Sequence, residues 1–177
     1  MDINSPLDPG EIRVIDNFLL NSEFAILSEE IQAKKFPWFY NPAVSTEGDG
    51  LFQYFHMFYS NKVGKSYHYE LILPTLRRLG GDRLHRAKVN SRTITNSIQK
   101  SNYHTDISNK IPYLATAILY INTNNGYTQF KESGRKIKSV ANRVVVFDPD
   151  LEHMGTSSTD ENRRIVLNLN YTLPHYK

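Results

Sequence analysis

The sequence predicts a mainly β protein whose N-terminal part carries helices. The character of the chain changes near residue 80. Before this point, two segments place apolar residues at helical spacing, and after residue 85 five segments are β-branched or alternate between apolar and polar side chains. Strands late in a chain that begins with helices are typical of an antiparallel barrel or sandwich with helices packed outside it.

The length and composition are those of one globular domain. The chain has 177 residues, of which 40% are hydrophobic and 22% are charged, so we expect a single domain over 1–177 with its own core. Within it, 1–85 would give helical and aromatic support, and 86–177 would form the β core. The absence of cysteine excludes disulfides, thiolate zinc sites and cysteine nucleophiles.

Charge and hydropathy bear on the partners and the location of the protein. The net charge of +3 and the pI near 9.0 permit nucleic acid as a partner, but no dense basic run indicates it. No apolar run is long enough to cross a bilayer, so no membrane partner is expected. The N-terminal segment has acidic residues and prolines where a signal peptide would have a basic start. We therefore expect a cytoplasmic protein.

Two helices and an aromatic segment make up the predicted N-terminal part. The segment 22–35 begins with Ser and acidic residues and repeats apolar positions as an amphipathic helix does. A second helix is predicted over 66–80, with an interruption at Pro74 and an end at Gly80. The aromatic-rich segment 36–60 has Gly and Asp at its centre, which favours two strands joined by a flexible loop.

Five strands are predicted in the C-terminal part, separated by turn sequences such as Asn125-Gly126 and Ser133-Gly134. They cover 86–95, 113–123, 127–131, 142–149 and 163–173.

Two of these strands have one apolar face and one face that carries polar groups. Along 163–173 the faces are Ile165, Leu167, Leu169 and Tyr171 against Arg164, Val166, Asn168 and Asn170. Along 113–123 they are Ala115, Ala117, Leu119 and Ile121 against Thr116, Ile118, Tyr120 and Asn122. Periodicity leaves two interpretations open. The polar faces either meet water, or they line a pocket inside a barrel whose outer face is covered by helices.

His104 and Asp106 are spaced so that both can bind one metal ion. Residues two apart on an extended backbone point to the same side. His153 follows the strand 142–149 on a turn-rich segment that can return to the same place. Two imidazoles and one carboxylate on one side of an ion form the facial triad of non-haem Fe(II) oxygenases. The spacing alone is a weak signal, and a polar loop is the alternative interpretation.

The order of motifs around these residues resembles a known enzyme family. The motif HTD precedes a strand, LYINTNNGYTQF follows, and RVVVFDPDLEH and TSSTDENRRIVLNLNY complete the order within 86–173. In this order the sequence resembles the Fe(II)- and 2-oxoglutarate-dependent oxygenases, in particular the prolyl-hydroxylase-like branch and small hydroxylases often encoded by phages. The resemblance implies a double-stranded β-helix, or jelly roll, with helices packed on the major sheet, in the cytoplasm of a bacterium or an infected host cell.

The resemblance also implies roles for particular residues. His104, Asp106 and His153 would bind Fe(II) as the catalytic centre, with 2-oxoglutarate and O2 as cosubstrates and succinate and CO2 as products. Tyr120 and a basic residue on the strand after the second histidine would bind the distal carboxylate of 2-oxoglutarate. Arg164 lies on the polar face of that strand, so we expect it in the pocket.

The neighbouring Arg163 lies on the apolar face of the same strand, so we expect it at the surface near Asp160 or Glu161. Asn90 and Arg92 face either the pocket or solvent. Four histidines are expected not to bind the metal, and they are His56, His68, His85 and His175.

Two glycine-containing segments also have predicted roles. Gly126 resembles the turn glycine that precedes a strand in the family. The segment 45–50 is flexible in composition and bounded by aromatic residues, so we expect it to act as a loop over the pocket mouth that becomes ordered when substrate binds.

The predicted function is hydroxylation of a C–H bond, with a protein or peptide side chain, prolyl among the candidates, as the favoured substrate. Two alternatives stay open. One is a catalytically silent jelly-roll binding module. The other is a divalent-metal hydrolase on a cupin-like barrel, with Asp148, Asp150 or Glu152 as its acid–base group. The hydrolase would leave Tyr120 and Arg164 unexplained.

Overall fold

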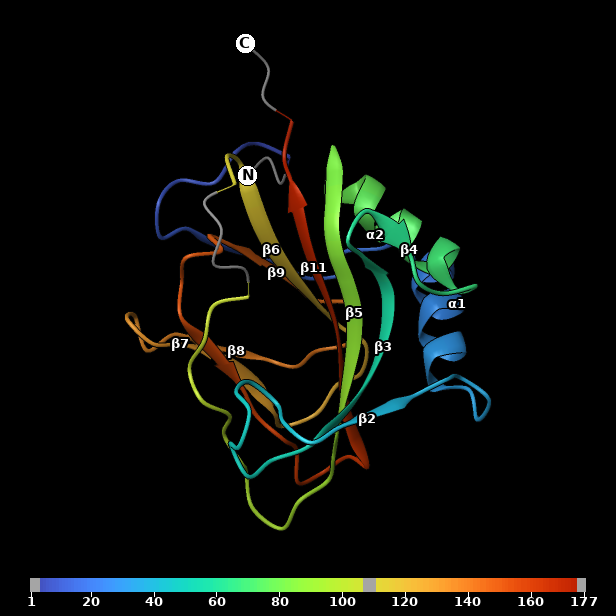
Figure 1. The fold of residues 1–177 in the computed structure, drawn as a ribbon, viewed down its shortest axis with the longest axis vertical. Coiled ribbons are helices and arrows are strands. Elements are labelled where there is room, and N and C mark those ends of the chain that lie inside the picture. Colours follow the sequence, from blue (N-terminus) through green and yellow to red (C-terminus); the bar gives the residue numbers. More distant parts are fainter. Residues whose placement is uncertain (1–3, 107–110, 175–177) are drawn as a thin grey trace.

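The computed structural model describes residues 4–106 and 111–174 as two antiparallel sheets with helices at one side (Figure 1). The larger sheet has eight strands in the order β1-β9-β6-β11-β5-β3-β2, and β4 pairs with β3. Its strands are β1 (Ile12–Ile15), β2 (Phe39–Asn41), β3 (Gln53–Ser60), β4 (Val63–Gly64), β5 (Arg83–Thr93), β6 (Leu114–Tyr120), β9 (Val144–Phe147) and β11 (Arg163–Thr172).

The smaller sheet has three strands in the order β10-β7-β8. They are β10 (His153–Gly155), β7 (Tyr127–Phe130) and β8 (Lys136–Lys138). The predicted mainly β class is therefore confirmed, and the two sheets are consistent with the jelly roll that the sequence predicted. The strands β1, β4, β8 and β10 were not predicted, because two to four residues are too few to show a period. The four-residue strands β7 and β9 were predicted from a turn sequence and from a β-branched run.

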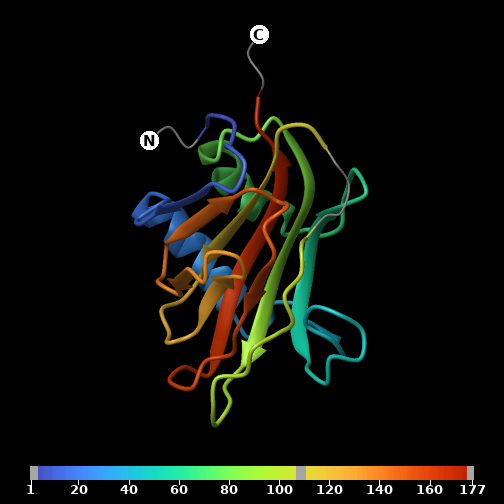
Figure 2. The same cartoon turned by 90° about the vertical axis from the view of Figure 1, so that its left-hand side faces the viewer.

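The larger sheet draws strands from both parts of the chain. In β1, Ile12 pairs with Phe147 of β9, and in β3, Tyr54 pairs with Ser91 of β5. Figure 2 shows β5 and β11, in green and red, running side by side. The segment 1–85 thus contributes strands as well as helices, and the single domain stays a prediction.

The helices are α1 (Asn21–Gln32), the short 3₁₀ helix η1 (Tyr69–Ile72) and α2 (Leu73–Arg78). The second predicted helix, 66–80, differs from the structure because Pro74 lies in the first turn of α2 instead of interrupting a longer helix. Proline is tolerated there because the first turn needs no donor from its N–H. None of the helices in the described part of the chain is long and apolar enough to cross a membrane.

The main apolar core contains residues of both the larger sheet and the helices. It buries the apolar faces of β6 and β11 together with residues of α1, η1 and the end of α2, among them Ala117, Leu119, Leu167, Leu169, Leu27, Ile31, Ile72 and Leu79. Each of the leucine and isoleucine side chains contributes about 1.5–3 kcal/mol when it is fully buried. The opposite face of β11 therefore turns away from this core, which is the condition for an internal polar pocket.

Candidate metal centre

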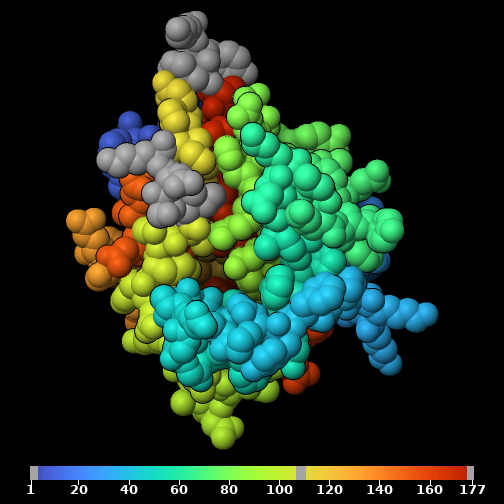
Figure 3. All heavy atoms as spheres, in the orientation of Figure 1, coloured from blue at the N-terminus to red at the C-terminus, as the bar shows by residue number. Residues whose placement is uncertain are grey.

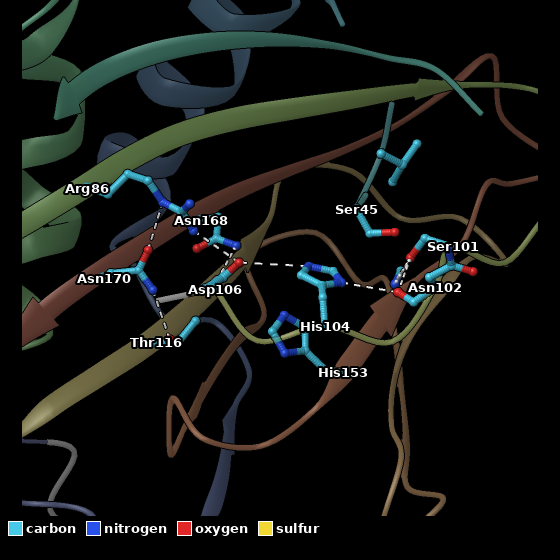
Figure 4. Close-up of polar contacts among 12 residues, drawn as sticks. Ser45, Arg86, Ser101, Asn102, His104, Asp106, Thr116, His153, Asn168 and Asn170 are labelled. Carbon is cyan, nitrogen blue, oxygen red and sulfur yellow. Dashed lines mark hydrogen bonds and ion pairs between the residues drawn. The ribbon is translucent and has the colours of Figure 1, made fainter. Parts of the chain in front are cut away.

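His104 and His153 are joined through their backbones. They form an isolated antiparallel bridge in which each N–H donates to the carbonyl oxygen of the other, at 3.0 and 2.9 Å. Their imidazole centroids are 4.8 Å apart. Asp106 follows on the same side, and one ligand atom from each of the three residues lies within 4.8 Å of the others (Figure 4). The sequence-predicted triad is therefore brought together in space.

The hydrogen bonds of both histidines leave one ring nitrogen free for a metal. Nδ1 of His104 lies 3.1 Å from the carbonyl oxygen of Asn102, and Nδ1 of His153 lies 3.1 Å from that of Leu151. A carbonyl oxygen only accepts, so each Nδ1 donates and each Nε2 keeps its lone pair. Burial lowers the pKa of His153, although Asp106 acts in the opposite direction. Neutral imidazoles oriented by a second hydrogen bond are suited to bind a metal.

Asp106 is ionised although its side chain is only 5% exposed. Its Oδ1 lies 3.0 Å from Nη2 of Arg86, and its Oδ2 accepts a hydrogen bond of 2.8 Å from Nδ2 of Asn168. Burial by itself would raise the pKa of Asp106, but Arg86, His153 and Asn168 hold it well below the usual range. The third candidate ligand is thus a buried carboxylate that stays charged at neutral pH.

Arg164 is 4% exposed and is held by neutral groups. Its Nε donates to Oγ of Ser139 at 2.8 Å, and its Nη2 donates to Oγ1 of Thr128 at 3.2 Å. Its guanidinium carbon lies 5.6 Å from the centre of the Tyr120 ring. Within 4–106 and 111–174 no carboxylate forms a salt bridge with it. The charge of this buried guanidinium is therefore available to an anionic ligand.

Tyr120 lies against Arg164, and its side chain is not in the pocket wall. It is fully buried, and its hydroxyl donates to Oγ1 of Thr128 at 2.9 Å. Arg163 lies outside the pocket, with its guanidinium 5.8 Å from the ring of Trp38. This contact replaces the predicted surface pairing of Arg163 with an acidic neighbour.

One pocket joins the triad to Arg164. His104, Asp106 and His153 line it together with Arg164 and Thr128. In Figure 3 the surface is hollowed between the green atoms of β5 and the yellow-green atoms that follow it in the chain. The other lining residues are Val44, Gln53, Lys88, Asn90, Arg92, Ser101, Ile118, Gly155, Val166 and Asn168. The polar face of β11 thus lines a pocket, which decides between the two interpretations for this strand. The corresponding face of β6 does not meet water either, since Ile118 lines the pocket and Thr116 and Tyr120 are buried.

Solved structures of similar fold are iron- and 2-oxoglutarate-dependent enzymes. A prolyl-4-hydroxylase from Pseudomonas putida matches with a TM-score of 0.67 at 14% identity, over 93% of this chain and 94% of that one. A 2OG-Fe(II) oxygenase family member from Burkholderia pseudomallei matches with a TM-score of 0.68 at 17% identity, over 93% and 86%. The chain has the fold of these oxygenases.

A viral collagen prolyl hydroxylase from Paramecium bursaria Chlorella virus-1 is more distant in structure, with a TM-score of 0.58 at 18% identity over 90% and 94% of the two chains. The carbocyclase SnoK from nogalamycin biosynthesis matches with a TM-score of 0.67 at 12% identity, over 92% and 79%. No family model matches the sequence, and no curated protein matches it. The chain is thus similar to these oxygenases in structure. The enzymes themselves differ in activity, since prolyl hydroxylases and a carbocyclase are among them.

The sequence analysis did not identify several polar residues of this pocket. Asn90 and Arg92 both line the pocket, so of the two orientations left open for them, toward the pocket or toward solvent, the structure shows the first. On the same face of β5, two and four residues earlier, lie Lys88 and Arg86. The alternation that identified Asn90 and Arg92 therefore pointed to these two cations as well. The two hydroxyls that hold Arg164 had no such local signal, because they lie on other segments.

Gly126 is required by close packing. Its φ is not among the positive values, so it is no left-handed turn residue. A Cβ at this position would lie 2.5 Å from Cδ of Arg164 and 2.7 Å from the carbonyl oxygen of Ser157. The absence of a side chain at Gly126 thus makes room for the stem of Arg164.

The segment 45–50 is organised by Asp49. This carboxylate accepts hydrogen bonds from the backbone N–H groups of Val44, Ser45 and Leu51, at 3.0, 2.9 and 3.0 Å. The loop is joined to the segment of the metal ligands because Nδ2 of Asn102 donates to Oγ1 of Thr46 at 3.0 Å. Val44 itself lines the pocket, so the loop lies at its wall.

His56, His68 and His85 lie outside the pocket lining. His56 uses both ring nitrogens, with the Pro37 carbonyl oxygen at 2.8 Å and Oγ of Ser66 at 2.7 Å. Nδ1 of His68 lies 3.3 Å from Oε1 of Glu30. His175 lies outside the described residues, so the expectation for it stays a prediction.

Proposed function

We propose that this protein is an Fe(II)- and 2-oxoglutarate-dependent dioxygenase that hydroxylates a C–H bond. The proposal rests on one observation. The imidazoles of His104 and His153 and the carboxylate of Asp106 line the same pocket as the buried guanidinium of Arg164, which has no counter-ion among the described residues. Two imidazoles and a carboxylate are suited to bind Fe(II), and the guanidinium is suited to bind the distal carboxylate of a dicarboxylic acid.

The residues of the chain divide the work of binding. Nε2 of His104, Nε2 of His153 and a carboxylate oxygen of Asp106 would hold the metal on one side and leave the other side open. Arg164 would bind the distal carboxylate of 2-oxoglutarate, while Tyr120 fixes the guanidinium from behind through Thr128. When bound, Fe(II) with 2-oxoglutarate and O2 supplies the oxidant, and succinate and CO2 are released.

The geometry does not favour the two alternative functions. A hydrolase needs an acid–base carboxylate beside the metal, but Asp106 is the only carboxylate among the described residues that line the pocket. Glu152 forms a salt bridge with Lys131 at 2.6 Å, and Asp148 accepts a hydrogen bond from the backbone of Gly10. A silent binding module would have no use for a buried, charged Asp106 between two histidines with free Nε2 atoms.

A protein or peptide side chain is the proposed substrate, in keeping with the prolyl-hydroxylase-like branch that the sequence resembles. One solved relative is a prolyl hydroxylase from Trichoplax adhaerens in complex with a peptide fragment of hypoxia inducible factor. It matches with a TM-score of 0.61 at 14% identity, so it supports the peptide proposal through the fold only.

Anaerobic titration with Fe(II) and 2-oxoglutarate tests the proposal. A weak visible charge-transfer band is expected in the wild-type protein, because a keto acid would chelate the iron. The band should be absent from His104→Ala and His153→Ala, each of which removes one ligand. Folded wild-type protein without the band would refute the oxygenase function.

Arg164→Ala and Arg163→Ala form a matched pair on adjacent positions. Loss of a charge-assisted contact with a ligand carboxylate costs about 2–5 kcal/mol. We therefore expect Arg164→Ala to raise the Kd of 2-oxoglutarate more than tenfold, measured from the band. Arg163→Ala should leave this Kd unchanged, because Arg163 contacts Trp38 outside the pocket. The reverse result would show that the wrong arginine has been assigned.

A further inference from the structure

Lys88 is a cation of the pocket wall that the proposed chemistry does not use. It lies on β5, and in the register of the sheet it stands opposite Asn168 of β11. Asn168 is the residue that donates to the candidate metal ligand Asp106. Lys88 is therefore placed at the metal end of the pocket.

The ammonium of Lys88 has no counter-ion of its own. Three cations line the pocket, namely Lys88, Arg92 and Arg164, and among the described residues the only lining carboxylate is Asp106. That carboxylate is already paired with Arg86 at 3.0 Å. No hydrogen bond or ion pair to the Lys88 ammonium is formed within 4–106 and 111–174. Lys88 is partly buried, and a partly buried cation without a partner is unfavourable, so this site is suited to an incoming anion.

The cosubstrate does not supply that anion. One carboxylate of 2-oxoglutarate would go to the metal and the other to Arg164. Arg92 stands directly opposite Arg164 in the sheet, so its charge acts at the same end of the pocket. Lys88 is four residues from Arg92 along β5, about 13 Å at the usual rise of a strand. With 2-oxoglutarate in place, Lys88 is left facing the metal end, where the C–H bond of the substrate must lie.

We propose that the substrate carries an acidic group and that Lys88 binds it, so that the positive charge selects anionic substrates and orients them at the metal. The inference rests on the proposed function and adds the chemical class of the substrate to it. A carboxylate and a phosphate are both suitable, since an ammonium acts as a point charge with three donors and does not require a planar partner. Burial and then the nearby Arg86 lower the pKa of Lys88, and Asp106 acts in the opposite direction without cancelling them, in agreement with an electrostatic cost that an anion would relieve.

Calorimetry with defined probes on the anaerobic Fe(II) and 2-oxoglutarate complex tests the inference. The probes are N-acetylaspartic acid amide, its neutral counterpart N-acetylasparagine amide, and inorganic phosphate. The titrations contain saturating 2-oxoglutarate, which would occupy Arg164, so binding of a probe at Arg164 does not contribute to the measured heat. We expect an acidic probe to bind wild type at least tenfold more tightly than the neutral amide. Lys88→Met should lose this preference and keep the charge-transfer band of 2-oxoglutarate.

Lys138→Met is the matched control, because it removes a lysine from an exposed position on β8, outside the pocket. It should keep the preference for the acidic probes. Equal affinity for acid and amide in wild type, or no binding of either acidic probe at millimolar concentration, overturns the inference. So does a Lys88→Met protein that keeps the preference, or one whose main defect is weaker binding of 2-oxoglutarate.

The outcomes also separate this inference from the proposed function. If the band forms and no acid preference is found, the oxygenase stands and the acidic substrate fails. If the band never forms but the preference exists and depends on Lys88, the oxygenase fails and the anion site stands. A thermal melt of each variant confirms that it is folded before it is titrated.

Discussion

The position of Arg164 depends on one missing side chain. Gly126 lies against the stem of this arginine, and a Cβ at this position would lie within 3 Å of Cδ of Arg164, the Ser157 carbonyl oxygen and Oδ1 of Asn124. The missing side chain of Gly126 leaves space for the stem of Arg164, and the hydroxyls of Ser139 and Thr128 hold its guanidinium by hydrogen bonds. Gly126 is not a candidate metal ligand, but it makes room for the arginine that is proposed to bind the cosubstrate.

Gly126→Ala tests this packing. The added methyl group would push Arg164 away from its hydroxyl partners, so the Kd of 2-oxoglutarate should rise about tenfold or more, which corresponds to roughly 1.4 kcal/mol. The charge-transfer band reports this affinity. Gly64→Ala is the control, because the nearest atom to an added Cβ there is 3.9 Å away. An unchanged Kd in Gly126→Ala would mean that Arg164 tolerates the displacement or does not bind the ligand.

At the scale of elements, the strands β5 and β11 bring two guanidiniums face to face. Arg92 and Arg164 are direct partners in the sheet, and both are buried. Nη1 of Arg92 donates to the carbonyl oxygens of Gln99 and Gly155, at 3.3 Å each. Burial and then Arg164 lower the pKa of Arg92 to about 10, with Asp49 acting in the opposite direction. Like charges opposite each other destabilise a sheet, so a ligand carboxylate between them would relieve the repulsion.

Arg92→Gln is expected to separate stability from ligand binding. The free protein should keep or gain thermal stability, since the repulsion with Arg164 is removed. The Kd of 2-oxoglutarate should rise several-fold, since one of the two cations at its distal end is lost. Melting curves without ligand and band titrations measure the two effects. A variant that binds 2-oxoglutarate as tightly as wild type would contradict the role given to Arg92.

The loop between β2 and β3 is a second element with its own stabilising group. Burial would raise the pKa of Asp49, but the N–H groups of Ser45, Leu51 and Val44 lower it from 3.8 to about 2. A carboxyl whose pKa is lower in the folded than in the unfolded state stabilises the ionised form. The contribution of Asp49 is therefore fully present above about pH 4 and is lost as the pH falls through 2.

Asp49→Ala should release this loop at neutral pH, because several backbone donors lose their shared acceptor. Hydrogen exchange of the amides of Val44, Ser45 and Leu51 should become faster, while the amides of β5 stay protected. Glu47→Gln is the control, since this exposed residue of the same loop is not the acceptor of these amides. Equal protection of the loop in Asp49→Ala and wild type would rule out the role of Asp49.

For the whole molecule, the candidate metal ligands link segments that are distant in the chain. His153 begins β10 of the smaller sheet, whereas His104 and Asp106 follow β5 of the larger one. Asp106 is fixed in turn by Asn168 of β11 and Arg86 of β5. A bound ion would therefore fasten the two sheets to each other in the native state only, and binding to the native state alone stabilises a protein.

Divalent metal should accordingly raise the melting temperature of the wild-type protein. At a free metal concentration about 100 times the Kd, the gain is about 2.7 kcal/mol, or roughly 5–10 °C for a protein of this size. Calorimetric melts of the anaerobic protein with and without Fe(II) measure this gain. His153→Ala should show little of it. An equal gain in wild type and His153→Ala would place the metal elsewhere.

Part of the site could be predicted because strand alternation and the spacing of two residues are visible within a short stretch of sequence. The two-residue period of a strand depends only on backbone geometry, so it put Arg164 and Asn168 on one face and the residues of the apolar core on the other. That the first face lines a pocket was decided by the structure. The spacing of His104 and Asp106 is local in the same sense. Short strands such as β1 and β10 could not be predicted in this way, since they depend on pairing partners elsewhere in the chain.

The sequence by itself determined the mainly β class, the common side of His104 and Asp106 and the face of the strand on which Arg164 lies, because alternation and spacing are properties of neighbouring residues. His153 was assigned as the third candidate ligand through the resemblance to the oxygenase family. Only the tertiary structure decided that Gly126 makes room for Arg164, that Tyr120 lies behind this arginine, and that Lys88 is left without a counter-ion. These features arise from contacts between segments tens of residues apart. Such contacts are set by the register of the sheets and the packing of the core, which no local pattern encodes.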